Sequence, residues 1–146
     1  MESNKVQGGF TFLEMVIVLG IVSLISLIGM SVFPLYDSRK DEQFLEQFRQ
    51  DIVFMQQAAI SNNSRYSLRW FTAHNKYIIT SGDMKVALVR EYDPEIKVEL
   101  VTLSSPMTYN ANGNINKGGM MYVFYKQNKY KVVFQLGRGR FSYYKI

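Results

Sequence analysis

The residues best suited to chemistry stand at the start of the chain, where a glycine pair precedes an apolar run. Gly8-Gly9 is followed by Phe10, and the apolar residues continue to Phe33. An ordinary secretory signal has its cleavage site after the apolar region and loses that region on processing. Proteolysis of the Gly9–Phe10 bond would leave the apolar segment at the N-terminus of the mature protein. The alternative is a flexible glycine hinge before an uncleaved signal anchor.

Glu14 is the one ionisable residue of the segment 10–33. A carboxylate within an apolar span is costly unless a partner neutralises it. Two interpretations stay open. The carboxylate either pairs with a cation in an assembly or snorkels to the membrane interface near the helix start, and we expect the pairing.

A second candidate is the glycine-bent turn Gly137-Arg138-Gly139-Arg140 near the C-terminus. Two arginines on such a turn can reach phosphate groups without obstruction by the backbone. Nearby cations and aromatic residues would extend it into a basic patch with stacking surfaces: Lys126, Lys129, Lys131, Lys145, Tyr143 and Tyr144. The alternative is a hairpin turn with solvated arginines, and about two to four phosphate contacts give only weak, salt-sensitive binding.

Composition argues against most enzyme classes. The chain has no cysteine, which excludes a thiolate metal site, a disulfide and a redox-active thiol. Its single histidine, His74, argues against a histidine metal centre, and no G-x-S-x-G motif is present to complete a triad. We therefore expect no catalytic residues, no cofactor and no metal. The formal net charge of +5 favours anionic partners only weakly.

The elements that position these residues begin with helices. Residues 10–33 form an apolar segment roughly 36 Å long at about 1.5 Å per residue, enough to cross a membrane. Apolar residues then recur at helical spacing over 34–61, which predicts an amphipathic continuation of the same helix. Pro34 should kink or locally unwind it. We place Asp41, Glu46, Arg49, Gln50, Gln56 and Gln57 on its polar face.

Residues 62–146 predict a head domain of strands and turns. We expect an α+β fold in which one small antiparallel sheet packs on the C-terminal half of the helix, with Trp70 against that helix. The predicted strands are 66–71, 77–80, 86–89, 96–103, 107–109, 120–125, 130–136 and 141–144.

The leader 1–9, with Gly9, Phe10, Glu14 and the uninterrupted apolar run, resembles the prepilin leader of type IV pilins and pseudopilins. Several segments beyond the leader are similar to the ComGD-type competence minor pilins and the related H-type pseudopilins: residues 50–52, 56–61, 98–103, 109–113, 118–119 and 136–140. The resemblance implies a pilin-like fold and a minor pilin of a competence type IV pilus that serves DNA uptake.

The resemblance also implies roles for individual residues. Prepilin peptidase would cleave between Gly9 and Phe10, and Phe10 would then be N-methylated. Glu14 would form an assembly salt bridge with the Phe10 amine of a neighbouring subunit. The arginine turn is similar to a G-R-x-R element through which some FimT-like minor pilins contact DNA, so the candidate DNA contacts are Arg138, Arg140, Lys131 and Lys145.

Expected partners are the prepilin peptidase, the major competence pilin, other minor pilins, the membrane before assembly and DNA through weak contacts. The N-terminus would be cytoplasmic and the head outside, first in the cell membrane and then in a surface pilus. Arg39 and Lys40 argue mildly against this orientation, and nearby acids offset them. The rivals are a minor H-type pseudopilin of a type II secretion system, a secreted hydrolase with a signal anchor, and a DNA receptor.

Overall fold

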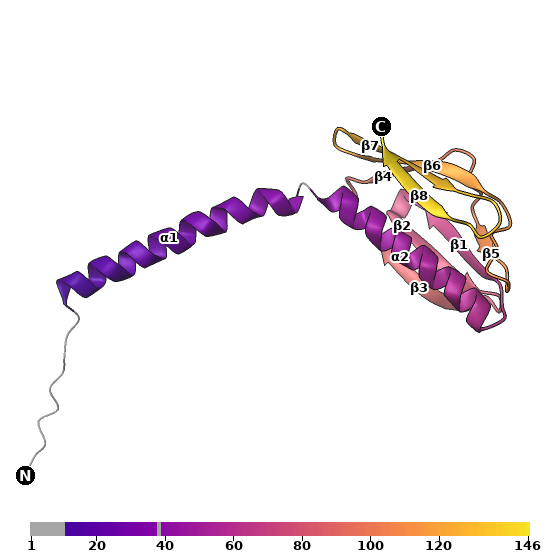
Figure 1. Cartoon of the computed structure of the whole chain (residues 1–146), viewed down its shortest axis with the longest axis horizontal. Helices are drawn as coiled ribbons and strands as arrows, with labels where there is room; N and C mark the ends of the chain where they lie inside the picture. Colours follow the sequence, from indigo (N-terminus) through magenta and orange to yellow (C-terminus); the bar gives the residue numbers. More distant parts are fainter. Residues whose placement is uncertain (1–10, 38) are drawn as a thin grey trace, which may run out of the picture. The chain divides into compact units, whose positions relative to one another are not determined.

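The computed structural model describes residues 11–37 and 39–146, with side-chain surroundings given for 11–26 and 39–146. The chain divides into two compact units, Met1–Arg39 and Lys40–Ile146. Within the described residues, the first unit contains the helix α1 and the second contains the helix α2, eight strands and a short 3-10 turn (Figure 1).

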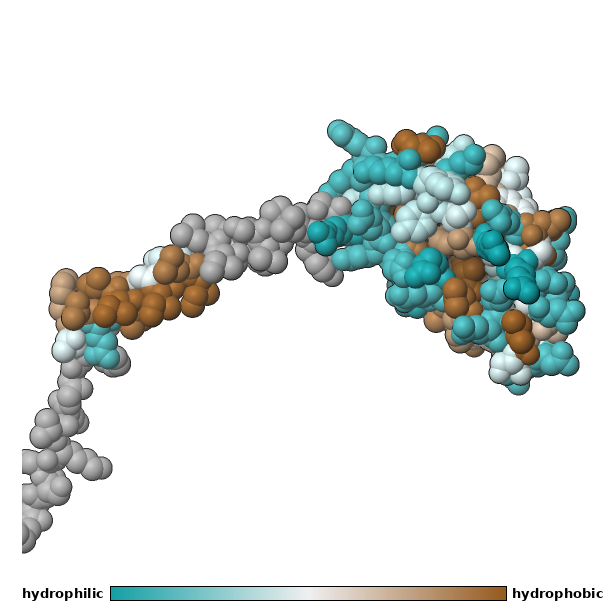
Figure 2. All heavy atoms as spheres, in the orientation of Figure 1, coloured by the Kyte–Doolittle hydropathy of each residue, from teal (hydrophilic) through white to brown (hydrophobic). Residues whose placement is uncertain are grey.

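Helix α1 spans Phe12–Asp37. Its described side chains are exposed, and all but Glu14, Ser23 and Ser26 are apolar, so most of this stretch is brown in Figure 2. The hydroxyls of Ser23 and Ser26 donate to the carbonyl oxygens of Leu19 and Val22, each at 2.8 Å. These polar groups are therefore satisfied within the helix itself.

No helix of the described part of the chain qualifies by length and apolarity as a membrane span. The expected span 10–33 includes positions outside the described residues, and it stays a prediction. Helix α1 extends past Pro34, where we expected a kink or local unwinding, and ends at Asp37. The continuous helix predicted over 10–61 is therefore two helical elements, because α2 begins at Lys40.

Helix α2 spans Lys40–Ser61 and buries one face. The predicted apolar stripe is confirmed, since all of its members are buried: Phe44, Leu45, Phe48, Ile52, Met55 and Ala59. The helix ends at Ser61, and Asn63 beyond it adopts the left-handed conformation (φ 45°) that asparagine tolerates. The Ser64 amide then donates to the Ala59 carbonyl at 3.1 Å, as expected for a helix end at 61–64.

The first sheet has the strand order β3-β2-β1-β5, all antiparallel. Its strands are β1 (Tyr66–Phe71), β2 (Lys76–Ser81), β3 (Val86–Glu91) and β5 (Met107–Tyr109). The 3-10 turn η1 (Thr72–His74) lies between β1 and β2. The predicted β2–β3 hairpin around Ser81-Gly82-Asp83 is confirmed.

The second sheet has the strand order β4-β6-β7-β8, again antiparallel. Its strands are β4 (Lys97–Leu100), β6 (Gly119–Tyr125), β7 (Asn128–Phe134) and β8 (Phe141–Lys145). Strand β4 is shorter than the predicted 96–103. The amides of residues 101, 102 and 103 all donate to the Met120 carbonyl at 3.1–3.2 Å, which ends the regular ladder.

Phe48 of α2 joins the two sheets in one core. Its ring lies 5.1 Å from Trp70 and 5.3 Å from Tyr77 of the first sheet, and 6.1 Å from Phe134 and 5.5 Å from Phe141 of the second. The expectation that Trp70 packs on the helix is confirmed. The fold class is as predicted, but the head holds two four-stranded sheets where we expected one, because the partner of each strand depends on contacts distant in sequence.

Candidate functional site

Glu14 lies in the first turn of α1, and its side chain is exposed. Its backbone amide donates to Thr11 Oγ1 at 3.3 Å and to the Thr11 carbonyl at 3.0 Å. Thr11 therefore caps the helix, and T-x-x-E is the sequence pattern of a capping box. This capping signal is local and can be read from the sequence, although we did not predict it. Gly9 and Phe10, the predicted cleavage junction, lie outside the described residues.

The arginine turn, residues 137–140, connects β7 to β8 and leaves both arginines exposed. Gln56 of α2 anchors it, because its Nε2 donates to the carbonyl oxygens of Gly113 and Arg138 at 2.7 and 2.9 Å. The Tyr109 hydroxyl donates to the Gly139 carbonyl at 2.8 Å. The sequence placed Gln56 on the polar helix face, and the structure makes it a half-buried support of this turn.

Gly139 shows why this turn needs glycine. Its φ is +61°, and a Cβ there would collide with the Tyr109 ring and hydroxyl. On either side, the Gln135 amide donates to the Arg140 carbonyl at 3.1 Å, and the Ile115 amide donates to the Gly137 carbonyl at 2.9 Å. The backbone that carries the two arginines is thus fixed from several directions.

A groove of about 630 Å³ lies between α2 and this turn, and we call it the arginine groove. Its basic lining is Arg49, Arg138 and Arg140, and its remaining lining is Ile52, Val53, Gln56, Ile60, Asn112, Gly113, Gly139 and Phe141. Arg49 is partly compensated, since its Nη2 lies 2.7 Å from Glu46 Oε1. Sequence analysis assigned Arg49 only to the polar helix face, because nothing local indicates which loop that face meets.

Lys131 and Lys145 are not part of the arginine groove lining. Lys131 lies on the solvent side of β7, opposite Tyr144. Lys145 ends β8, roughly 17 Å along the strand from Arg140, and its Nζ lies 6.0 Å from the Tyr130 ring centroid. The structure therefore brings Arg138 and Arg140 together and places the two lysines elsewhere.

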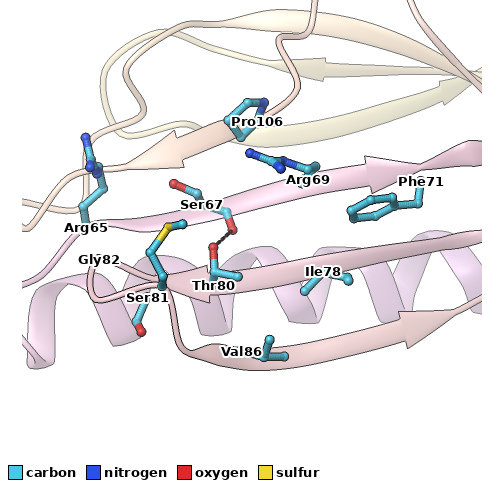
Figure 3. Close-up of a pocket in the computed structure, with 11 residues that line it drawn as sticks. Arg65, Ser67, Arg69, Phe71, Ile78, Thr80, Ser81, Gly82, Val86 and Pro106 are labelled. Atoms are coloured by element: carbon cyan, nitrogen blue, oxygen red, sulfur yellow. Dashed lines mark hydrogen bonds between the residues drawn. The ribbon is translucent and has the colours of Figure 1, made fainter.

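A second groove, about 250 Å³, lies on the outer face of the first sheet (Figure 3). Arg65 and Arg69 stand over an apolar floor that includes Phe71, Ile78 and Val86. Alternate residues of β1 face the core, so Arg69 and Phe71 face the opposite side of the sheet. None of them was predicted to be functional.

Two carboxylates of α2 are buried, against expectation for Asp41, which we placed on the polar face. Asp41 is 1% exposed and accepts hydrogen bonds from Tyr130 Oη at 2.8 Å and Asn128 Nδ2 at 2.7 Å. Asp51 is 4% exposed and is bound by Arg90, Tyr77 and Gln47. Asp41 thus attaches α2 to the second sheet and Asp51 attaches it to the first.

Stability should fall at low pH through Asp41. Burial raises the pKa of its carboxyl, but the hydrogen bonds from Tyr130, Asn128 and the Glu42 amide outweigh burial, so the pKa lies below 3.8. The unfolded chain therefore takes up this proton first as the pH falls, and folding loses stability from about pH 4 downward. We expect Asp41→Asn to flatten this part of the profile of urea midpoint against pH.

The control for this test is Asp83→Asn, which removes an ion pair with Lys85 in which both side chains are more than half exposed. Hydrogen bonds from Lys85 and Ser81 lower the pKa of Asp83 to about 2, but solvent screens a pair this exposed, so its contribution to stability is small and this variant should keep the wild-type acid loss. An Asp41→Asn profile as steep as that of the wild type would contradict the assignment.

No group of three or more potential metal ligands occurs within the described residues.

Two comparisons concern the sequence. Residues 4–30 match the family model of the prokaryotic N-terminal methylation motif. Over 139 residues the chain is 34% identical to competence protein ComGD of Bacillus subtilis (strain 168), covering 92% of this chain and 91% of that protein.

Two solved structures are similar in fold. The minor pseudopilin EpsH from the type 2 secretion system of Vibrio cholerae gives a TM-score of 0.58 at 12% identity, covering 72% of this chain and 96% of that chain. The type IV minor pilin FimU of Pseudomonas aeruginosa gives a TM-score of 0.61 at 11% identity, covering 73% of this chain and 90% of that chain. At these identities the likeness concerns the fold alone.

Proposed function

This chain belongs to the ComGD family of competence minor pilins, and we propose that it assembles through its N-terminal helix into the competence pilus and meets DNA through its head. The observation that carries the proposal is the identity to competence protein ComGD, which extends across the apolar segment and the head. The likeness to EpsH concerns fold alone, so nothing specific favours a role in type II secretion. The chain acts by assembly, without catalytic residues or a cofactor.

The N-terminal methylation motif implies processing by prepilin peptidase and a membrane-anchored pilus component. We place the cleavage between Gly9 and Phe10 and the methyl group on the Phe10 amine. Before assembly the helix crosses the membrane with its N-terminus cytoplasmic and the head outside. Afterwards the helices of this chain, the major competence pilin and other minor pilins pack together in the filament. Mass spectrometry of sheared pili tests this, and a peptide that still contains residues 1–9 would contradict it.

The arginine groove is the proposed DNA contact of the head. Arg138 and Arg140 project from a backbone that Gln56 and Tyr109 hold in place, so contact with phosphates requires no ordering of the backbone and costs only the rotamer entropy of the two side chains. Arg49 borders the same groove. Lys131 and Lys145 lie outside the groove, so we assign the phosphate contacts in it to the arginines alone.

Charge reversal tests the groove. In the full chain in zwitterionic detergent, Arg138→Glu/Arg140→Glu should weaken duplex DNA binding. The slope of log K against log salt is negative, and its magnitude should decrease by about two. The matched control is Arg65→Glu/Arg69→Glu, which changes net charge equally at two exposed arginines of the first sheet. Equal losses in both variants would show a general charge effect and remove this groove as the contact.

A further inference from the structure

The solvent side of the second sheet carries lysines and aromatic rings in register. In β6 the buried residues are Met121, Val123 and Tyr125, so Tyr122 and Phe124 point to the other face. Lys129 and Lys131 occupy the same face of β7, where they pair with Phe124 and Tyr122. The edge strands add Lys97 opposite Phe124 and Tyr144 opposite Lys131. We call the six residues the lysine–aromatic face: Lys97, Tyr122, Phe124, Lys129, Lys131 and Tyr144.

The side chains of this face already contact one another. Lys129 Nζ lies 4.1 Å from the Tyr122 ring centroid and 5.3 Å from that of Phe124. The two rings have centroids 6.1 Å apart. Tyr144 is 57% exposed at the edge strand. Tyr143, its neighbour in sequence, points to the opposite side, where its ring packs against Phe141 and Tyr130.

The charge of the face suits an anion. The face carries three lysines and one carboxylate, that of Glu99, which lies opposite Tyr122 in the β4–β6 pair. The rings of Tyr122 and Phe124 are half-buried on the inner strand β6. Their solvent-facing parts, with lysines around them, offer π faces to bases and cations to phosphates. This combination distinguishes the face from the second groove, where two arginines lie over an apolar floor that contains a single aromatic ring, Phe71.

We propose that the lysine–aromatic face binds single-stranded DNA by stacking bases on Tyr122, Phe124 and Tyr144 while the three lysines contact phosphates. The proposal rests on the proposed role in DNA uptake and adds a second contact of different chemistry to that of the arginine groove. The groove lies at the turn between β7 and β8, and none of the six residues lines it.

The relative strengths of the two interactions favour replacement of the Lys129–Tyr122 contact by a stacked base. An exposed cation–π contact such as that of Lys129 on Tyr122 changes an equilibrium constant by about two- to fivefold. A base stacked on an aromatic side chain changes it by about five- to 150-fold. A base can therefore displace the ammonium from the ring, and the ammonium remains beside it to meet the phosphate.

The same argument excludes duplex DNA as the preferred ligand of this face. In a duplex the π faces of the bases are already stacked on one another, so only phosphates and groove edges reach a flat sheet. A duplex would gain contacts with the lysines but none with the rings. Selectivity for unpaired bases is thus the property that separates this face from a general basic patch.

The test compares three probes with the full chain in zwitterionic detergent: a 12-nucleotide oligothymidylate, an abasic strand of equal length and charge, and a 12-base-pair duplex. The wild type should bind oligothymidylate at least about tenfold more tightly than the abasic strand, the equivalent of one modest stack. Tyr122→Leu/Phe124→Leu should remove most of that difference, since only Tyr144 is left to stack, and leave abasic binding unchanged. Tyr144→Ser, at an exposed edge, should reduce it several-fold without a folding penalty.

Phe54→Leu is the matched control, because it removes a 44% exposed ring from α2 and should change nothing. Trp70 fluorescence checks that each variant is folded. Equal wild-type affinity for oligothymidylate and the abasic strand would overturn the proposal. Tighter binding of the duplex, or an unchanged preference in both ring variants, would do the same. The presence of the chain in sheared pili is measured separately, so failure of the pilus role and failure of this face are distinguishable.

Discussion

A chain carrying Glu14→Ala is expected to be cleaved normally at its leader and to be absent from sheared pili, with transformation lowered by at least about a hundredfold. An N-terminal amine enclosed among apolar helices needs a counter-charge, and removing one member of a buried ion pair costs about 3–5 kcal/mol. That corresponds to roughly a hundred- to several-thousandfold in an equilibrium constant. Mass spectrometry and immunoblotting of membranes and sheared pili measure cleavage and incorporation separately.

The fold around Glu14 makes the substitution specific. The Thr11 cap receives the backbone amide of residue 14, which alanine retains, so the helix start is preserved. Glu14→Gln keeps the shape and removes the charge, and it should resemble Glu14→Ala. Glu91→Gln, at an exposed carboxylate of β3, is the control and should assemble normally. Normal incorporation of the Glu14 variants would refute the salt bridge with Phe10.

The second large effect is expected from Arg90→Gln, which should destabilise the head by about 3 kcal/mol. Arg90 Nε and Nη2 each lie 2.9 Å from an oxygen of Asp51, which is buried under the first sheet. Tyr77 Oη donates to the same carboxylate at 2.7 Å, and burial with this hydrogen bond raises the pKa of Tyr77. Without Arg90 a buried carboxylate keeps only neutral donors.

Urea titration of the full chain in detergent measures this loss. Trp70, the single tryptophan, lies in the core beside Tyr77 and reports on it by fluorescence. With a slope of about 1–3 kcal/mol per molar urea, the midpoint should fall by roughly 1–3 M. Arg49→Gln is a close control, because Arg49 binds Glu46 with similar geometry (2.9 and 2.7 Å) on the surface. Equal shifts for the two variants would mean that the burial of Asp51 has no energetic consequence.

The local elements of this fold were predictable because their signals are local. The spacing of Phe44, Phe48, Ile52 and Met55 indicates a helix face whatever that face meets. The segments 66–71 and 107–109 coincide with β1 and β5, and the glycines of the arginine turn mark the last hairpin. The pairing of strands into two sheets was not predictable, since partners such as β1 and β5 are distant in sequence.

The sequence by itself determined the membership of this chain in a minor pilin family, through the leader motif, the apolar run and the amphipathic helix, whose periodicities need no knowledge of distant partners. Only the tertiary structure decided which polar residues matter. It buries Asp41 and Asp51, makes Gln56 a support of the arginine turn, and separates Lys131 and Lys145 from Arg138 and Arg140. The reason is physical: the burial and pairing of a polar side chain depend on the strand or loop that covers it, and that neighbour is fixed by long-range register.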